Sequence, residues 1–249
     1  MQHDEKKVGG RELLITILMS YAFLTLLAAT ISEIPLIKES PNNKILQNTV
    51  GTISFQCTFL CSSIISVFYL RMPSLSALGI TQGSWIKVIS WTISTALVAI
   101  LLCYSSNALL HNLLVDNEIA PTQQEAVKDI QKIQSDSVLF LLFFTTVILA
   151  PVSEELFFRC VLFHTIKKNG QWFAYVFISL IFAVLHMQAP QSEGMKGIIG
   201  PAITTIPFVL LSSLLFTVYR ITKNILAPIG CHILFNLTGF LIARGYFLI

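Results

Sequence analysis

The sequence carries little charge for its length. Only 12% of its 249 residues are Asp, Glu, Lys or Arg, whereas 54% are hydrophobic and the mean hydropathy is +0.74. Soluble domains carry about 25% charged residues, so this composition excludes an ordinary soluble domain. The net charge of +3 is modest, and no basic stripe with interleaved aromatic residues is present, which argues against a nucleic-acid partner. We predict an all-α polytopic membrane helical bundle that forms one integral membrane domain, residues 1–249.

Cysteine frameworks and metal-binding motifs are also missing. The five cysteines are odd in number, lie in apolar segments and form no CxxC pair. We therefore expect small core residues, and neither a disulfide framework nor a CxxC zinc site. An HExxH motif is absent as well. The chain shows no internal repeat, which weakens the hypothesis of a small-molecule transporter.

Long apolar runs make up most of the chain. About seven of them can span a bilayer, and an eighth helix or a re-entrant segment stays open as an alternative. The predicted spans are residues 13–31, 50–70, 86–110, 137–166, 172–186, 198–219 and 224–243. The first run has no A-x-A cleavage site after it, so we expect a retained helix and not a signal peptide. Residues 116–136 are polar, and they predict an amphipathic surface helix or a solvated loop.

The charges of the connecting segments predict the orientation. With a cytoplasmic amino end, nine Lys and Arg residues fall on the inner side and six on the outer side. The positive-inside rule therefore places the amino end in the cytoplasm and the carboxyl end outside. The short chain without large loops favours a protein of a bacterial cell membrane.

Residues 150–159, which read A-P-V-S-E-E-L-F-F-R, place two carboxylates and a guanidinium inside an apolar run. Charged side chains at bilayer depth cost about 2.5 to 3.5 kcal/mol each, so they are rarely left there without a partner or a function. Glu155 and Arg159 share a helix face, which suits a buried ion pair. Glu154 points about 100° away and lacks that local partner. Pro151 is expected to kink the helix and help admit water.

Three further polar residues lie at similar depths in other spans. Measured from the cytoplasmic helix ends, Glu154 lies about 20 Å deep, His186 about 21 Å, and His232 and Asn236 about 12 and 18 Å. His232 and Asn236 are four apart, so they present two hydrogen-bond donors to one point, as an oxyanion site requires. Glu154 and His186 could together deprotonate a water molecule. Alone, His186 also suits an interfacial role, and the other two suit hydrogen bonding between helices.

The same residues carry a resemblance to a known family. E-E-L-F-F-R at 154–159, F-A-V-L-H at 182–186 and H-I-L-F-N at 232–236 resemble the EExxxR, FxxxH and HxxxN motifs of the CPBP family. This family comprises the type II CAAX prenyl endopeptidases and the bacterial Abi or bacteriocin-processing proteins. The motifs occur in the family's order, and the peptidase region would cover about 136–249.

The resemblance implies a role for each residue. Glu154 and His186 would activate water, and His232 and Asn236 would hold the oxyanion. Glu155 and Arg159, which could equally form a structural ion pair, would support the site. The family's eukaryotic members resemble metal-independent glutamate peptidases, so we expect no cofactor, although two histidines and a glutamate could also bind zinc.

Two functional hypotheses follow. The first is an intramembrane endopeptidase whose partners are the lipid bilayer and a peptide or lipidated protein substrate, either a prenylated CAAX protein or a secreted, bacteriocin-like precursor. The second is a non-catalytic membrane partner that binds a peptide or regulates a sensor protein through the same residues.

Overall fold

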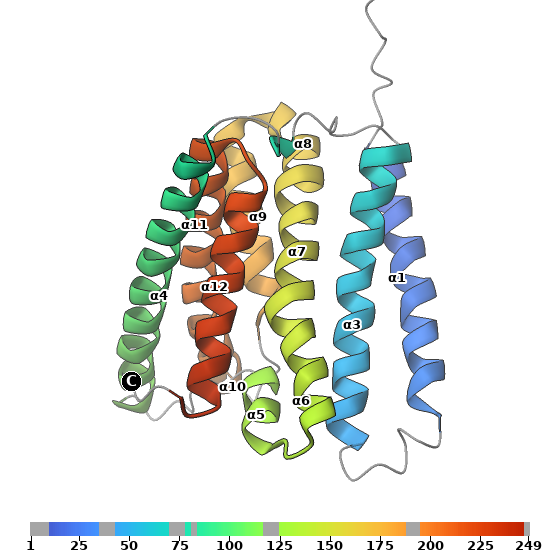
Figure 1. Cartoon of the computed structure of the whole chain (residues 1–249), viewed down its shortest axis with the longest axis vertical. Helices are drawn as coiled ribbons and strands as arrows, with labels where there is room; N and C mark the ends of the chain where they lie inside the picture. The colour runs from blue at the N-terminus through green and yellow to red at the C-terminus, as the bar shows by residue number, and fades with distance from the viewer. Residues whose placement is uncertain are drawn as a thin grey trace, which may run out of the picture. The chain divides into compact units, whose positions relative to one another are not determined.

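The computed structural model describes residues 10–34, 43–69, 78–80, 84–116, 125–187 and 195–246 (Figure 1). Every regular element within these ranges is helical, which confirms the all-α prediction. The principal helices are α1 (Gly10–Ser32), α3 (Asn43–Ile64), α4 (Trp85–Asp116), α5 (Glu125–Lys132), α9 (Gln171–Leu185), α10 (Met195–Thr204), α11 (Ile206–Thr222) and α12 (Leu226–Ala243).

Five stretches of helix are long and apolar enough to cross a membrane. They are Lys44–Val67, Trp85–Asp116, Asp136–Asn169, Ile198–Thr222 and Leu226–Ala243. Two shorter apolar helices, Ile17–Ile31 and Gln171–Leu185, coincide with the remaining two predicted spans. The protein is therefore an integral membrane protein, while the count of seven crossings stays a prediction.

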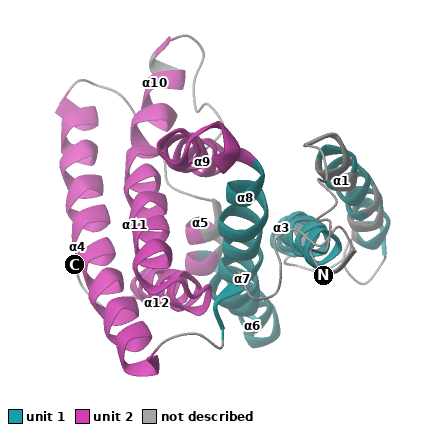
Figure 2. Ribbon diagram, turned by 90° about the horizontal axis from the view of Figure 1, so that it is seen from above, with its two compact units in different colours: residues 1–81, 132–165 teal, residues 82–131, 166–249 magenta. Residues whose placement is uncertain are grey.

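The chain divides into two compact units, coloured separately in Figure 2. Unit 1 contains residues 1–81 and 132–165, and unit 2 contains residues 82–131 and 166–249. The prediction of a single domain is not decided by this division. Each unit is described by itself below.

In unit 1, α3 packs against the long helical run Asp136–Asn169. Gln56 of α3 contacts Ser153 and Glu154, and one turn further on Phe59 stacks on Phe157 at 4.5 Å between ring centroids. The contacts advance in the same direction along both helices, so the two helices run parallel.

The run Asp136–Asn169 is α-helical only in parts. It consists of α6 (Asp136–Phe143), η3 (Phe144–Leu149), α7 (Ala150–Glu155), η4 (Leu156–Leu162), α8 (Phe163–Ile166) and η5 (Lys167–Asn169). The segments η3 and η4 are π-helical, and Pro151 lies in the first turn of α7, directly after η3. A proline cannot donate a backbone hydrogen bond, and wide turns of this kind are frequent at functional sites. The irregularity expected at Pro151 thus takes the form of π-helical turns.

In unit 2, α11 packs against α4, α9 and α12. One sequence-based boundary was wrong there. The third span does not end near residue 110, because α4 continues to Asp116 and leaves His111 exposed within the helix. The sixth predicted span lies within the apolar stretch Ile198–Thr222, which is interrupted at Thr205 between α10 and α11. Pro207, in the first turn of α11, has no N–H to continue the ladder of α10.

Several smaller predictions are confirmed. The side-chain oxygen of Asn224 accepts a 2.9 Å hydrogen bond from the backbone N–H of Leu226, at the start of α12. The polar segment 116–136 contains the helix α5, and Ile130 on it is buried. All five cysteines are free. Three of them are buried, whereas Cys57 and Cys61 are only half-buried and are therefore not full core residues.

Candidate active site

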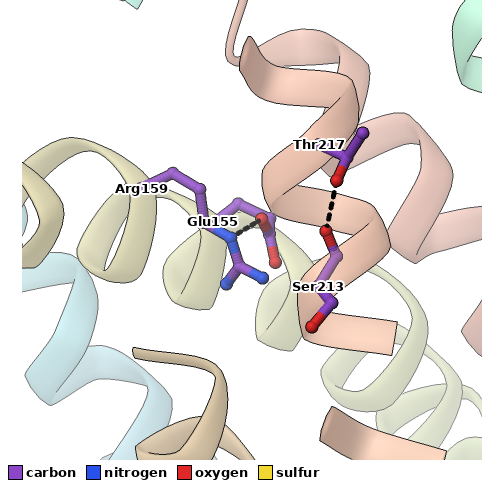
Figure 3. A network of polar contacts seen from close by, with 4 residues as sticks. All are labelled: Glu155, Arg159, Ser213 and Thr217. Atoms are coloured by element: carbon purple, nitrogen blue, oxygen red, sulfur yellow. Dashed lines mark hydrogen bonds and ion pairs between the residues drawn. The ribbon is translucent and has the colours of Figure 1, made fainter. Parts of the chain in front are cut away.

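Glu155 and Arg159 form the ion pair that their spacing predicted. Arg159 Nε lies 2.9 Å from Glu155 Oε2, and both side chains are completely buried (Figure 3). Removing two charges from water costs several kcal/mol per ion, so such a pair is a costly way to gain stability and is more often retained to fix a geometry. The pair joins two positions one helical turn apart, directly after Glu154.

Glu154 is buried too, with 4% of its surface exposed, and its partner comes from α3. Gln56 donates from Nε2 to Glu154 Oε1 at 2.7 Å, and Ser153 donates from Oγ to Gln56 Oε1 at 2.5 Å. Glu154 Oε2 has no hydrogen-bond partner among the described residues. One carboxylate oxygen is therefore fixed, and the other is buried without a described partner.

His186 lies at the end of α9 in unit 2, and its ring orientation is defined on several sides. The ring stacks on Phe182 at 4.4 Å and on Phe208 at 4.7 Å between centroids. Nδ1 lies 2.7 Å from the carbonyl oxygen of Phe182. Because a carbonyl can only accept, Nδ1 carries the proton in this contact, and in the neutral ring Nε2 is then the basic nitrogen.

His232 projects from α12 and is buried, with its ring 5.8 Å from the same Phe182 ring. Phe182 thus brings together the two predicted histidines of unit 2. Asn236 follows one turn later on α12 and is partly exposed. These two residues occupy the i and i+4 positions that can present two donors to one oxygen.

Glycines on α12 allow a close approach to α4. A Cβ on Gly239 would lie 3.1 Å from Tyr104 Oη, and a Cβ on Gly230 would lie 3.0 Å from Thr92 Cγ2. Small residues at such positions let helices in membranes pack backbone to backbone. This packing fixes the rotation of α12, and with it the direction in which His232 and Asn236 project.

The described residues contain no group of three or more His, Cys, Asp or Glu side chains arranged to hold a metal ion. The predicted residues fall into two sets. Unit 1 contains Glu154 with the Glu155–Arg159 pair, and unit 2 contains His186 with His232 and Asn236.

The comparison with protein families covers residues of both sets. Residues 136–238 match the family model described as type II CAAX prenyl endopeptidase Rce1-like. The CPBP resemblance is thereby confirmed for this segment. All six predicted residues lie within the Rce1-like segment, and the family is one of CAAX-type intramembrane proteases.

A curated relative extends the similarity beyond the Rce1-like segment. The chain is 25% identical to UPF0177 protein YvdC of Lactococcus lactis subsp. lactis over 202 residues, which is 78% of this chain and 67% of the relative. No solved structure matches the chain significantly.

The sequence gave no indication of Gln56 as a partner of Glu154. Gln56 lies on α3, outside the Rce1-like segment, and 98 positions separate the two residues. The available signal was a single buried amide in an apolar span, beside serines and cysteines that were interpreted as packing residues. A long polar side chain in an apolar span indicates a buried hydrogen-bond partner, as the carboxylate of Glu154 does.

Proposed function

We propose that this protein is an intramembrane endopeptidase that hydrolyses a peptide bond of a membrane-associated or lipidated substrate. The observation that carries the proposal is the Rce1-like match over 136–238, which contains both carboxylates, the arginine and the three polar residues of unit 2. The geometry of Glu154 supports it, because a buried carboxylate with one fixed oxygen and one oxygen without a described partner suits a general base.

The first step is the activation of water. Glu154 takes a proton from the water molecule through Oε2, while His186 orients the water through Nε2. The water oxygen then bonds to the carbonyl carbon of the substrate, and the carbonyl π electrons move to its oxygen. The stacking of His186 between two phenylalanines limits its motion, which favours a preorganised geometry.

The second step is the collapse of the tetrahedral intermediate. His232 and Asn236 donate hydrogen bonds to the oxyanion, each contributing about 2.7 to 4 kcal/mol in a working site. When the carbonyl re-forms, the C–N bond breaks and the proton held by Glu154 passes to the leaving nitrogen. The products are an amine and a carboxylic acid, which then releases its proton to solvent, with no covalent enzyme intermediate. Glu155 and Arg159 keep the backbone of Glu154 in place.

The substrate proposed first is a prenylated CAAX-type carboxyl-terminal peptide, because the matching family is described by that activity. A secreted or bacteriocin-like precursor peptide is the second candidate. Both lie at or in the bilayer, which suits a protein whose helices are long and apolar enough to span it.

The test compares peptide termini in membranes and culture fluid of cells with the wild-type protein, Glu154→Gln or Asp136→Asn at matched expression. Asp136 is an exposed carboxylate at the start of the same helical run, so Asp136→Asn controls for loss of a charge. We expect termini that the wild type and Asp136→Asn produce and Glu154→Gln does not. If cells with Glu154→Gln keep the phenotype of cells with the wild-type protein and produce the same peptide termini, the result would instead favour a non-catalytic peptide-binding partner.

A further inference from the structure

Gln56 is not alone in joining its helix to α7 and η4. Aromatic contacts also hold these elements together, since Phe59 stacks on Phe157 at 4.5 Å and contacts Phe158 edge-on at 5.5 Å between ring centroids. An apolar side chain of the same length at position 56 would fill the same space but leave Glu154 Oε1 buried without its donor. Gln56 is 4% exposed and is hydrogen-bonded to Glu154 and to Ser153.

The two bonds of Gln56 define the orientation of its amide. Ser153 Oγ lies 2.5 Å from Gln56 Oε1 and 3.0 Å from the carbonyl oxygen of Ala150, so its single proton has the amide oxygen as the nearer acceptor. With Oε1 occupied by a donor, Nε2 faces Glu154. A reversed amide would place its oxygen against the carboxylate oxygen and lose that bond, and Ser153 Oγ would have to accept from Nε2 and give up its donation to Oε1. The carboxylate and the Ser153 hydroxyl together therefore favour the orientation in which Gln56 donates to Glu154.

A donor on one carboxylate oxygen determines what the other can do. Glu154 Oε1 is held at 2.7 Å, which fixes the plane and rotamer of the carboxylate. Glu154 Oε2 is buried and lacks a partner among the residues that the structure describes. Oε2 is thus the one oxygen of the Glu154 carboxylate without a hydrogen bond to the described residues.

We propose that Gln56 is a positioning residue for the general base: its amide, oriented by Ser153, holds Glu154 so that Oε2 faces the attacking water. This inference rests on the proposed function, because it assigns Glu154 the role of base. It adds to the active site a residue outside the Rce1-like segment.

The experiment uses the full chain in membranes and two readouts. The first is turnover of a fluorogenic farnesylated CAAX peptide, or of the peptide identified by the terminus comparison. Gln56→Met removes the amide at similar size, and Ser153→Ala removes its orienting hydroxyl. Ser63→Ala is the matched control, because Ser63 is a buried residue of α3 that bonds its own helix at the Phe59 carbonyl oxygen.

We expect Gln56→Met to lower kcat about ten- to a hundredfold with KM nearly unchanged, as misplacement of a catalytic group does. Ser153→Ala should lower kcat less, and in the double variant the two effects should not multiply, because Ser153 acts through Gln56. An effect of Gln56→Met on kcat no larger than that of Ser63→Ala overturns the inference, as does full multiplicativity in the double variant.

The second readout does not depend on activity. A hydrophobic carbodiimide modifies protonated carboxyl groups in membranes, and mass spectrometry measures its addition to Glu154. Loss of the amide donor should raise the labelling rate about tenfold, the effect of one hydrogen bond to a charged group, while Ser63→Ala leaves it unchanged. If Gln56→Met does not accumulate, labelling in Ser153→Ala decides, and an unchanged rate there overturns the inference.

The two readouts separate the two proposals. If Gln56→Met changes the labelling rate of Glu154 but the wild-type chain cleaves no peptide, the result supports the positioning of Glu154 by Gln56 and contradicts the proposed function. Peptide cleavage with unaltered labelling and unaltered kcat removes the positioning role and leaves the proposed function standing.

Discussion

Gln56 donates a hydrogen bond to Glu154 across 98 positions of sequence, from a helix outside the family segment to a carboxylate within it. This bond gives the amino-terminal part of the chain a chemical role that its apolar composition does not suggest. It also gives Glu154 two unequal oxygens, one bonded and one without a described partner. The predictions below concern the groups around it.

The buried ion pair predicts a large loss of stability when one partner is removed. Arg159→Met leaves Glu155 as a buried charge without its cation, so we expect destabilisation of about 3 to 5 kcal/mol. The double variant Glu155→Gln/Arg159→Met should recover much of this loss. Thermal unfolding of the detergent-solubilised proteins measures both values. A single variant as stable as the wild type would show that the pair does not determine the local conformation.

Phe208 is predicted to matter for activity more than for stability. Its ring centroid lies 4.7 Å from that of His186, and the side chain is only half-buried. Phe208→Leu therefore removes the ring that stacks on one face of the His186 imidazole, at a modest loss of packing energy. We expect turnover to fall at least about tenfold through misorientation of the ring. Phe177→Leu, at an exposed position of α9, is the control and should retain activity. Equal activities of the two variants would contradict an oriented His186.

The approach of α12 to α4 predicts a coupling between two residues. Gly239→Ala gains up to about 1 kcal/mol of helix propensity, but the new Cβ would lie 3.1 Å from Tyr104 Oη and force a shift. Tyr104→Phe removes that oxygen. We therefore expect Gly239→Ala to be more favourable in the Tyr104→Phe background than in the wild type, measured as a double-mutant cycle of unfolding free energies. Additive effects would mean that the two helices are not in close contact there.

Activity is predicted to survive removal of divalent metal. The proposed mechanism assigns the activation of water to Glu154 and His186 and the oxyanion to His232 and Asn236, so it includes no step at a metal ion. Peptide turnover should be unchanged after treatment with EDTA and 1,10-phenanthroline followed by gel filtration. A loss of activity that added zinc restores would assign the histidines to a metal site.

The sequence predicted the features that depend on local pattern. The apolar runs indicated the helices, the i and i+4 spacing indicated the Glu155–Arg159 pair, and Asn224 indicated the start of α12. It did not predict the partner of Glu154, because a hydrogen bond between distant segments leaves no periodic signal. The interruption at Thr205 has no counterpart in hydropathy, which is continuous through residues 198–222. Its physical cause is Pro207, which lies in the first turn of α11 and has no N–H to continue the preceding helix.

The parallel arrangement of α3 and α7 has a consequence for biogenesis. The ribosome delivers Gln56 to the membrane well before Ser153 and Glu154, since α4 and α5 are synthesised in between. During that interval the amide has none of the partners that it holds in the folded protein, and a lone amide in hydrocarbon is costly. The amide of nascent α3 is therefore in a less favourable environment until the second helix arrives to hydrogen-bond it.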